Sequence, residues 1–141
     1  LPFCGYNMGD YFAHWLDVSR TDGAKMPRVY YVNWFRKDDD GRFLWPGYGE
    51  NSRVLKWIFE RCDGAAEARE TPIGNLPTPD ALDTDGLKID AGALETLLSV
   101  DVAAWKSELP QLKKHYEKFG ANLPRELAQE LQDLENRLNE A

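Results

Sequence analysis

Aromatic and turn-forming residues are concentrated between Asn33 and Asn51, in the stretch N-W-F-R-K-D-D-D-G-R-F-L-W-P-G-Y-G-E-N. Its five aromatic side chains are Trp34, Phe35, Phe43, Trp45 and Tyr48. The same stretch contains a run of charges, a Pro-Gly pair and three glycines, which are typical of turns. Flat rings held on loops favour a flat ligand, so these residues indicate binding of a planar base by stacking.

Two long motifs in this region resemble the nucleotide-base segment of GTP-dependent phosphoenolpyruvate carboxykinases. They are N-W-F-R-K-D from Asn33 and G-R-F-L-W-P-G-Y-G-E-N-S-R-V-L from Gly41. The opening sequence L-P-F-C-G-Y-N-M-G-D-Y-F-A-H-W-L resembles the segment that precedes it in that family, and E-T-P-I-G at residues 70–74 and the helical tail also fit. The resemblance covers essentially the whole chain, but only the C-terminal portion of such an enzyme.

The resemblance implies a guanine pocket in this chain. Its expected members are Trp34, Phe35, Phe43, Tyr48, Gly49, Glu50 and Asn51. Phe35 and Tyr48 are expected on the two faces of guanine, with Phe43 at its edge and Trp34 adjoining. Position 48 is Tyr where the family is expected to have Phe, and stacking should survive because the ring is retained.

Selection of guanine over adenine requires hydrogen bonds, because stacking tolerates every base. By the resemblance, Asn51 bonds the polar edge of the base, and its amide can both donate and accept. Two simpler interpretations stay open from the sequence alone. Phe35, Phe43 and Tyr48 could be ordinary core. Asn51 could be only a helix N-cap, or could serve both as a cap and as a base contact.

The activity implied by the resemblance is conversion of oxaloacetate and GTP to phosphoenolpyruvate, GDP and carbon dioxide, with Mn²⁺ or Mg²⁺. In that family the phosphate loop, metal ligands and substrate-binding arginines lie upstream of the portion seen here. The sequence accordingly contains no G-x-x-x-x-G-K-S/T, no H-E-x-x-H and no Cys/His cluster. We expect no catalytic residue and no metal ligand in this chain, and no activity from the chain alone. Its expected partners are guanine nucleotide and the remainder of the parent enzyme.

The run Asp38–Asp40 invites a calcium-binding interpretation. An EF-hand loop would require Asp or Asn at position 42, which is Arg42, and its glycine and final glutamate are misplaced. A solvated turn is the better interpretation.

Composition excludes several classes of function. The 141 residues are 43% hydrophobic and 29% charged, with a net charge of −7, which argues against a general nucleic-acid surface. No apolar run is long enough to span a bilayer, and no signal segment opens the chain. Cys4 and Cys62 are expected to be free thiols in a reducing cytoplasm. The start at Leu1, without Met, indicates a fragment or a processed product.

The sequence predicts an α+β fold, helix-rich, with a small antiparallel hairpin or sheet near residues 28–45. The β-branched and aromatic run Arg28–Phe35 predicts a strand, with alternate side chains on opposite faces. Lys37–Gly41 should turn the chain, and residues 43–45 could pair back. Leu1–Gly9 is expected to be extended or looped, with Asp10 capping the first helix.

Several amphipathic helices are expected to follow. One begins at Asn51 or Ser52 and ends at Gly64, with a buried stripe of Val54, Leu55, Ile58 and Phe59. Another is capped by Asp90, and a longer one is capped by Asp101 and should be kinked or split at Pro110. The last begins near Pro124, with the stripe Leu127, Leu131, Leu134 and Leu138. Residues 67–74 are a possible further strand.

We expect one C-terminal, base-binding portion over residues 1–141. Residues 1–75 form the strand, loop and helix segment with the guanine pocket, and residues 76–141 form a helical tail. The alternative function is a non-catalytic helical protein-interaction module in which residues 101–141 do the work. Nucleotide binding that depends on the aromatic side chains distinguishes the two.

Overall fold

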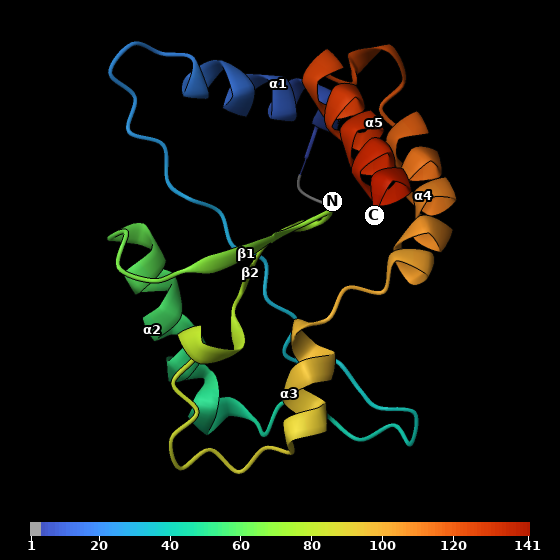
Figure 1. Ribbon diagram of the computed structural model, residues 1–141. Coiled ribbons are helices and arrows are strands. Elements are labelled where there is room, and N and C mark those ends of the chain that lie inside the picture. The colour runs from blue at the N-terminus through green and yellow to red at the C-terminus, as the bar shows by residue number, and fades with distance from the viewer. Residues whose placement is uncertain (1–3) are drawn as a thin grey trace. The chain divides into compact units, whose positions relative to one another are not determined.

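The computed structural model describes residues 4–141 and shows a helix-rich α+β fold (Figure 1). The α-helices in these residues are α1 (Met8–Ser19), α2 (Asn51–Cys62), α3 (Ala91–Leu98), α4 (Val102–Glu117) and α5 (Arg125–Glu140). Short 3₁₀ helices are η1 (Tyr48–Glu50), η2 (Pro79–Ala81) and η3 (Gly120–Asn122). Strands β1 (Ala68–Thr71) and β2 (Gly74–Pro77) form a two-stranded antiparallel sheet. The expected fold class is confirmed.

The chain forms two compact units. One contains Arg28–Val100, and the other combines the N-terminal residues as far as Pro27 with Asp101–Ala141. The expected division into a base-binding segment (1–75) and a helical tail (76–141) stays a prediction. The whole aromatic stretch from Asn33 to Asn51 lies in the first of these units.

The sheet of the 28–100 unit lies later in the chain than the sequence predicts. β1 pairs with β2 from Ala68 opposite Pro77 to Thr71 opposite Gly74. The hydroxyl of Thr71 donates to the carbonyl of Gly74 at 2.6 Å and closes the hairpin. The possible strand at residues 67–74 is therefore the first half of this hairpin.

The predicted strand at Arg28–Phe35 is wrong, because the described residues contain no strand there. The nearest pairing is an isolated bridge between Lys37 and Phe43. Strand propensity is high in this run, but a strand also needs a partner to receive its backbone hydrogen bonds. The predicted alternation of faces is nevertheless confirmed: Val29, Tyr31 and Phe35 are exposed, whereas the residues between them include the half-buried Tyr30, Val32 and Trp34.

Helix α2 buries a different side chain from those expected. Leu55 and Phe59 are exposed, whereas Trp57 is only 4% exposed. Its indole nitrogen donates to the carbonyl of Glu67 at 3.1 Å, which ties α2 to the residue before β1. The large indole therefore occupies the inward face, and the predicted stripe is rotated around the helix. Gly64 follows the helix end with φ of 76°, as expected for a C-terminal glycine.

In the other unit, α1 begins earlier than expected. Its N-cap is Asn7 and not Asp10, and the side-chain oxygen of Asn7 accepts from the backbone nitrogen of Gly9 at 2.7 Å. The amide nitrogen of Asn7 also donates to the carbonyl of Phe119 at 3.1 Å. Asn caps as well as Asp does, and this second bond favours it. Of the expected loop at residues 1–9, the first three residues lie outside the described residues, and Met8 and Gly9 are helical.

Helices α4 and α5 lie side by side (Figure 1) and bury Leu109, Phe119 and Leu138. Leu138 is fully buried, and the other three leucines of its stripe are half-buried. Pro110 lies inside α4 without splitting it, so of the two expected effects, a kink or a split, the split is wrong. Pro110 is exposed, so water can satisfy the carbonyl that loses its helical partner.

Candidate functional site

A tight turn presents Phe35 and Phe43. Gly41 adopts φ of 79° at its tip, and the bridge between Lys37 and Phe43 closes it. Asp38 fixes the turn from inside, because its carboxylate accepts from the backbone nitrogen of Arg42 at 2.8 Å and from Arg42 Nε at 2.9 Å. The backbone N–H of Arg42, followed by its guanidinium, holds the pKa of Asp38 below its usual value. The expected turn is confirmed, and the carboxylates of Asp38 and Asp40 are both engaged by Arg42.

The rings of Phe35 and Phe43 meet edge to face. Their centroids are 6.1 Å apart at 63°, and the two residues are 72% and 57% exposed. The Lys37 ammonium lies 5.0 Å from the centroid of the Phe43 ring, a cation–π arrangement. Neither ring belongs to the core of its unit, so the interpretation of these side chains as ordinary core is wrong for the described structure.

Tyr48 begins η1 and is 92% exposed. Its ring contacts no other aromatic ring within residues 4–141, so the structure does not bring it into contact with Phe35. Gly47 precedes it with φ of 126°, a conformation that favours glycine. Gly49 is exposed, and open space surrounds the position of its missing Cβ. The loop is thus compatible with close approach of a ligand to its backbone.

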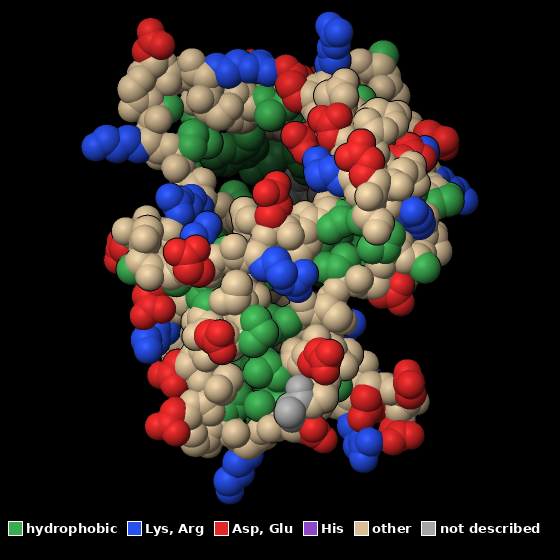
Figure 2. Space-filling model, viewed as in Figure 1, with side chains coloured by type: hydrophobic (Ala, Val, Ile, Leu, Met, Phe, Trp, Pro, Cys, Tyr) green, Lys and Arg blue, Asp and Glu red, His purple; other side chains and the backbone are tan. Residues whose placement is uncertain are grey.

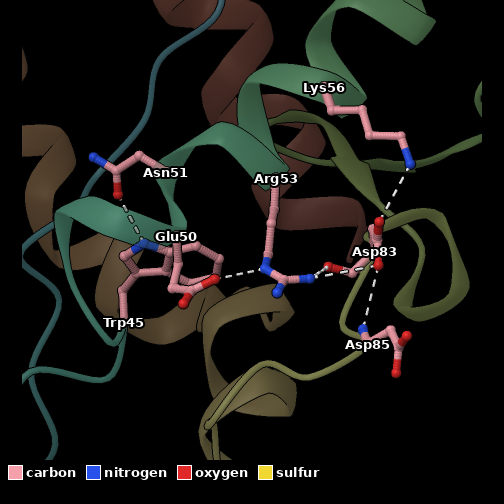
Figure 3. Close-up of polar contacts among 7 residues, drawn as sticks. All are labelled: Trp45, Glu50, Asn51, Arg53, Lys56, Asp83 and Asp85. Atoms are coloured by element: carbon pink, nitrogen blue, oxygen red, sulfur yellow. Dashed lines mark hydrogen bonds and ion pairs between the residues drawn. The ribbon is translucent and has the colours of Figure 1, made fainter.

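Trp34, Trp45 and Asn51 form a connected set behind the loop. The rings of Trp34 and Trp45 are 6.3 Å apart, and Trp45 is only 7% exposed. The indole nitrogen of Trp45 donates to Asn51 Oδ1 at 2.9 Å (Figure 3). The N-cap of α2 is Glu50, without a capping side-chain bond, so the interpretation of Asn51 as the cap is wrong. The Asn51 side chain is used instead to contact Trp45.

Glu50 belongs to an ion network at the start of α2 (Figure 3). Its carboxylate lies 2.6 Å from Arg53 Nε, and Arg53 Nη1 donates to the carbonyl of Asp83 at 2.8 Å. The Asp83 carboxylate accepts from Lys56 at 3.3 Å and from the backbone nitrogen of Asp85 at 3.2 Å. The bond to Glu50 raises the pKa of Arg53, and the Asp85 N–H is the main cause of the lowered pKa of Asp83. The network ties the 83–85 loop to the turn that carries Tyr48 and Glu50.

Sequence reasoning missed three of the residues that hold this site: Lys37, Arg53 and Asp83. The spacing of three between Glu50 and Arg53 on a helix is a recognisable ion-pair signal. Lys37 lies opposite Phe43 in the predicted turn, so a cross-strand pair was foreseeable. Asp83 lies 30 residues from Arg53, and no local pattern indicates that contact.

Within residues 4–141, no three His, Cys, Asp or Glu side chains are grouped so that they could hold a metal ion. By the family resemblance the ligands of the divalent cation lie outside this chain, and that stays a prediction. No helix in the same range is long and apolar enough to cross a membrane. On the face drawn in Figure 2, Lys and Arg side chains are scattered among Asp and Glu side chains.

Residues 1–137 match a family model described as the phosphoenolpyruvate carboxykinase C-terminal P-loop domain, which puts the chain in the class of P-loop domains. The chain belongs to the phosphoenolpyruvate carboxykinase family. The phosphate-loop motif G-x-x-x-x-G-K-S/T is nevertheless absent from its sequence.

Three relatives named phosphoenolpyruvate carboxykinase (GTP) illustrate the match. The protein from Treponema pallidum is 54% identical over an alignment of 141 positions that covers 99% of this chain. Those of Neocallimastix frontalis and Chlamydia muridarum are 55% and 50% identical, over 100% and 98% of the chain. The chain spans only 23% of the length of each relative.

Proposed function

We propose that this chain is the guanine-binding C-terminal part of a GTP-dependent phosphoenolpyruvate carboxykinase. The complete enzyme would convert oxaloacetate and GTP to phosphoenolpyruvate, GDP and carbon dioxide. The observation that carries the proposal is the exposed pair Phe35 and Phe43, held on a braced turn in the same unit as the Asn51 amide. The names of the relatives, at about half identity over the whole chain, support the choice of GTP.

In this proposal Phe35 and Tyr48 stack on opposite faces of guanine, and Phe43 contacts its edge. Each stacked face contributes about 1–3 kcal/mol. Trp34 adjoins the rings, Gly49 and Glu50 shape the loop, and Asn51 bonds the polar edge of the base.

The chain's own contribution is binding and orientation of the base. Phosphoryl transfer needs cations and a metal ion around the phosphates. This chain carries a net charge of −7, and its described residues hold no metal cluster. The phosphate loop, the ligands of Mn²⁺ or Mg²⁺ and the substrate-binding arginines would come from the remainder of the parent enzyme. The chain by itself should therefore produce no phosphoenolpyruvate from oxaloacetate, GTP and Mn²⁺. A cytoplasmic location stays a prediction from the free Cys4 and Cys62.

The alternative, a helical interaction module, loses its main support in the structure. It relies on the leucine stripe of α5, but Leu138 is fully buried and the stripe packs against α4 of the same unit. No exposed leucine row is left on α5 for a partner.

Binding of nucleosides by the 141-residue chain tests the proposal. Without phosphate-binding cations, affinity should be weak, on the order of millimolar, and guanosine should bind no worse than GTP at low salt. The fluorescence of Trp34 and Trp45 reports the titration, with adenosine and high salt as comparisons. Micromolar binding of GTP without binding of guanosine would contradict the proposal, because phosphates and not the base would then carry the affinity.

A further inference from the structure

The Asn51 amide has only one orientation compatible with its neighbour. The indole N–H of Trp45 can donate but cannot accept, so the atom 2.9 Å from it must be the amide oxygen. The Asn51 amide nitrogen consequently points away from Trp45, as Figure 3 shows. In the part of the chain that the structure describes, this NH₂ group has no hydrogen-bond partner. The group is therefore available to a ligand as a donor.

Reversing the amide would be costly. It would place NH₂ against the indole N–H and leave a donor of the nearly buried Trp45 without a partner. The backbone of Asn51 is also fixed, because its N–H donates to the carbonyl of Tyr48 and its φ and ψ are helical. Neither the backbone nor the side chain of Asn51 is therefore free to reorient.

We propose that Trp45 is a specificity-determining positioning residue, which holds the Asn51 amide so that it presents a donor and not an acceptor to the base. This inference rests on the proposed function, in which Asn51 faces the polar edge of the base. Guanine carries a carbonyl acceptor at C6, whereas adenine carries an amino donor there. A fixed NH₂ group can donate to the guanine carbonyl, but it meets another donor in the amino group of adenine. Trp45 thus excludes adenine without touching the nucleotide.

The replacement Trp45→Phe removes the N–H but keeps an aromatic ring. In the full-length protein, the released amide can turn its oxygen toward adenine, so the affinity for ATP should rise by about 5–150-fold. The affinity for GTP should fall only about twofold, because the amide still adopts the donor orientation part of the time. If Trp45 has only a structural role, Trp45→Phe should lower the melting temperature and reduce the affinities for both nucleotides equally. An unchanged ratio of the Kd values for ATP and GTP overturns the inference.

The replacement Asn51→Asp provides a second test of the inference if the Trp45→Phe protein does not fold. The carboxylate still accepts from Trp45 but presents an oxygen to the base, so the preference should move from GTP toward ATP. Retention of the wild-type preference by Asn51→Asp also overturns the inference.

The replacement Phe35→Leu separates this inference from the proposed function. It should lower the affinities for GTP and ATP by the same factor, because stacking does not depend on base identity. If Phe35→Leu weakens both nucleotides but Trp45→Phe leaves their ratio unchanged, only the role of Trp45 is wrong. If Phe35→Leu changes neither affinity, the base site and the role of Trp45 are both wrong.

Discussion

Phe35 and Phe43 face each other across the turn at residues 37–43, with ring centroids 6.1 Å apart and both rings open to solvent. Their spacing depends on the turn and on the Asp38 carboxylate that accepts from Arg42, and not on burial in a core. The turn at residues 37–43 therefore sets the positions of both rings. Changes in its backbone should affect the candidate site as directly as changes in the rings.

Replacement of Gly47 by Ala should destabilise the loop that carries Tyr48. Gly47 adopts φ of 126°, which costs a residue with a Cβ on the order of 1–3 kcal/mol. The melting temperature should fall, as measured by circular dichroism. Gly49→Ala is the matched stability control, because its Cβ would meet open space. Equal melting temperatures for the two variants would show that the positive φ of Gly47 does not contribute to the stability of the folded protein.

Replacement of Gly9 by Ala should destabilise the unit that contains α1. A Cβ at Gly9 would lie 2.2 Å from the carbonyl oxygen of Asn122, so the helix or η3 must shift. Such overpacking typically costs 1–3 kcal/mol. Gly5→Ala, where a Cβ meets nothing within 4 Å, should leave the free energy of unfolding unchanged. Denaturant titration of both variants measures the difference, and a stable Gly9→Ala protein would contradict the close packing.

The ion network at the start of α2 should make stability depend on acid pH. The pKa of Asp83 is lower in the folded chain than its usual value, mainly because of the Asp85 N–H and also because of Lys56. The ionised carboxylate therefore contributes stability above about pH 4, and this contribution is lost as the pH falls through the lowered pKa. Asp83→Asn should be less stable than the wild type at pH 7, with the difference shrinking below pH 4.

Asp85→Asn is the control for that experiment. Asp85 contributes its backbone N–H to the contact with Asp83, and the replacement keeps that group. Denaturant midpoints of the two variants should differ at pH 7. A pH-independent loss in Asp83→Asn would indicate a packing role and not a charge role.

Local signals predicted much of this structure. Asp90 and Asp101 cap α3 and α4 as expected, because an N-cap bond spans only two or three residues. Local signals could not decide whether residues 28–35 form a strand, because a strand forms only where another strand pairs with it. The rotation of the α2 stripe toward Trp57 depends on a bond to Glu67 that the helical pattern does not contain.

The candidate site was likewise predictable where it depends on local sequence, and not where it depends on packing between separate elements. Its aromatic side chains and the turn between them lie within 19 residues of sequence, so composition and motif identified them. The alternative interpretation of Asn51 as an N-cap is wrong, although Asn at a helix start often caps. Its bond to Trp45 and the bond of Arg53 to Asp83 depend on how separate elements pack, and no pattern in the sequence specifies them.

Nucleotide affinity of the variant Phe35→Leu in the full-length protein is the most direct test of the central claim that this chain binds guanine by stacking. The matched control is Tyr31→Leu, because Tyr31 is at least as exposed and lies four residues earlier, outside the proposed site. We expect Phe35→Leu to raise the Kd for GTP by about 5–150-fold, the equivalent of one lost stacking face, while Tyr31→Leu leaves it unchanged. Equal Kd values for Phe35→Leu and wild type, with both proteins folded, would contradict the claim.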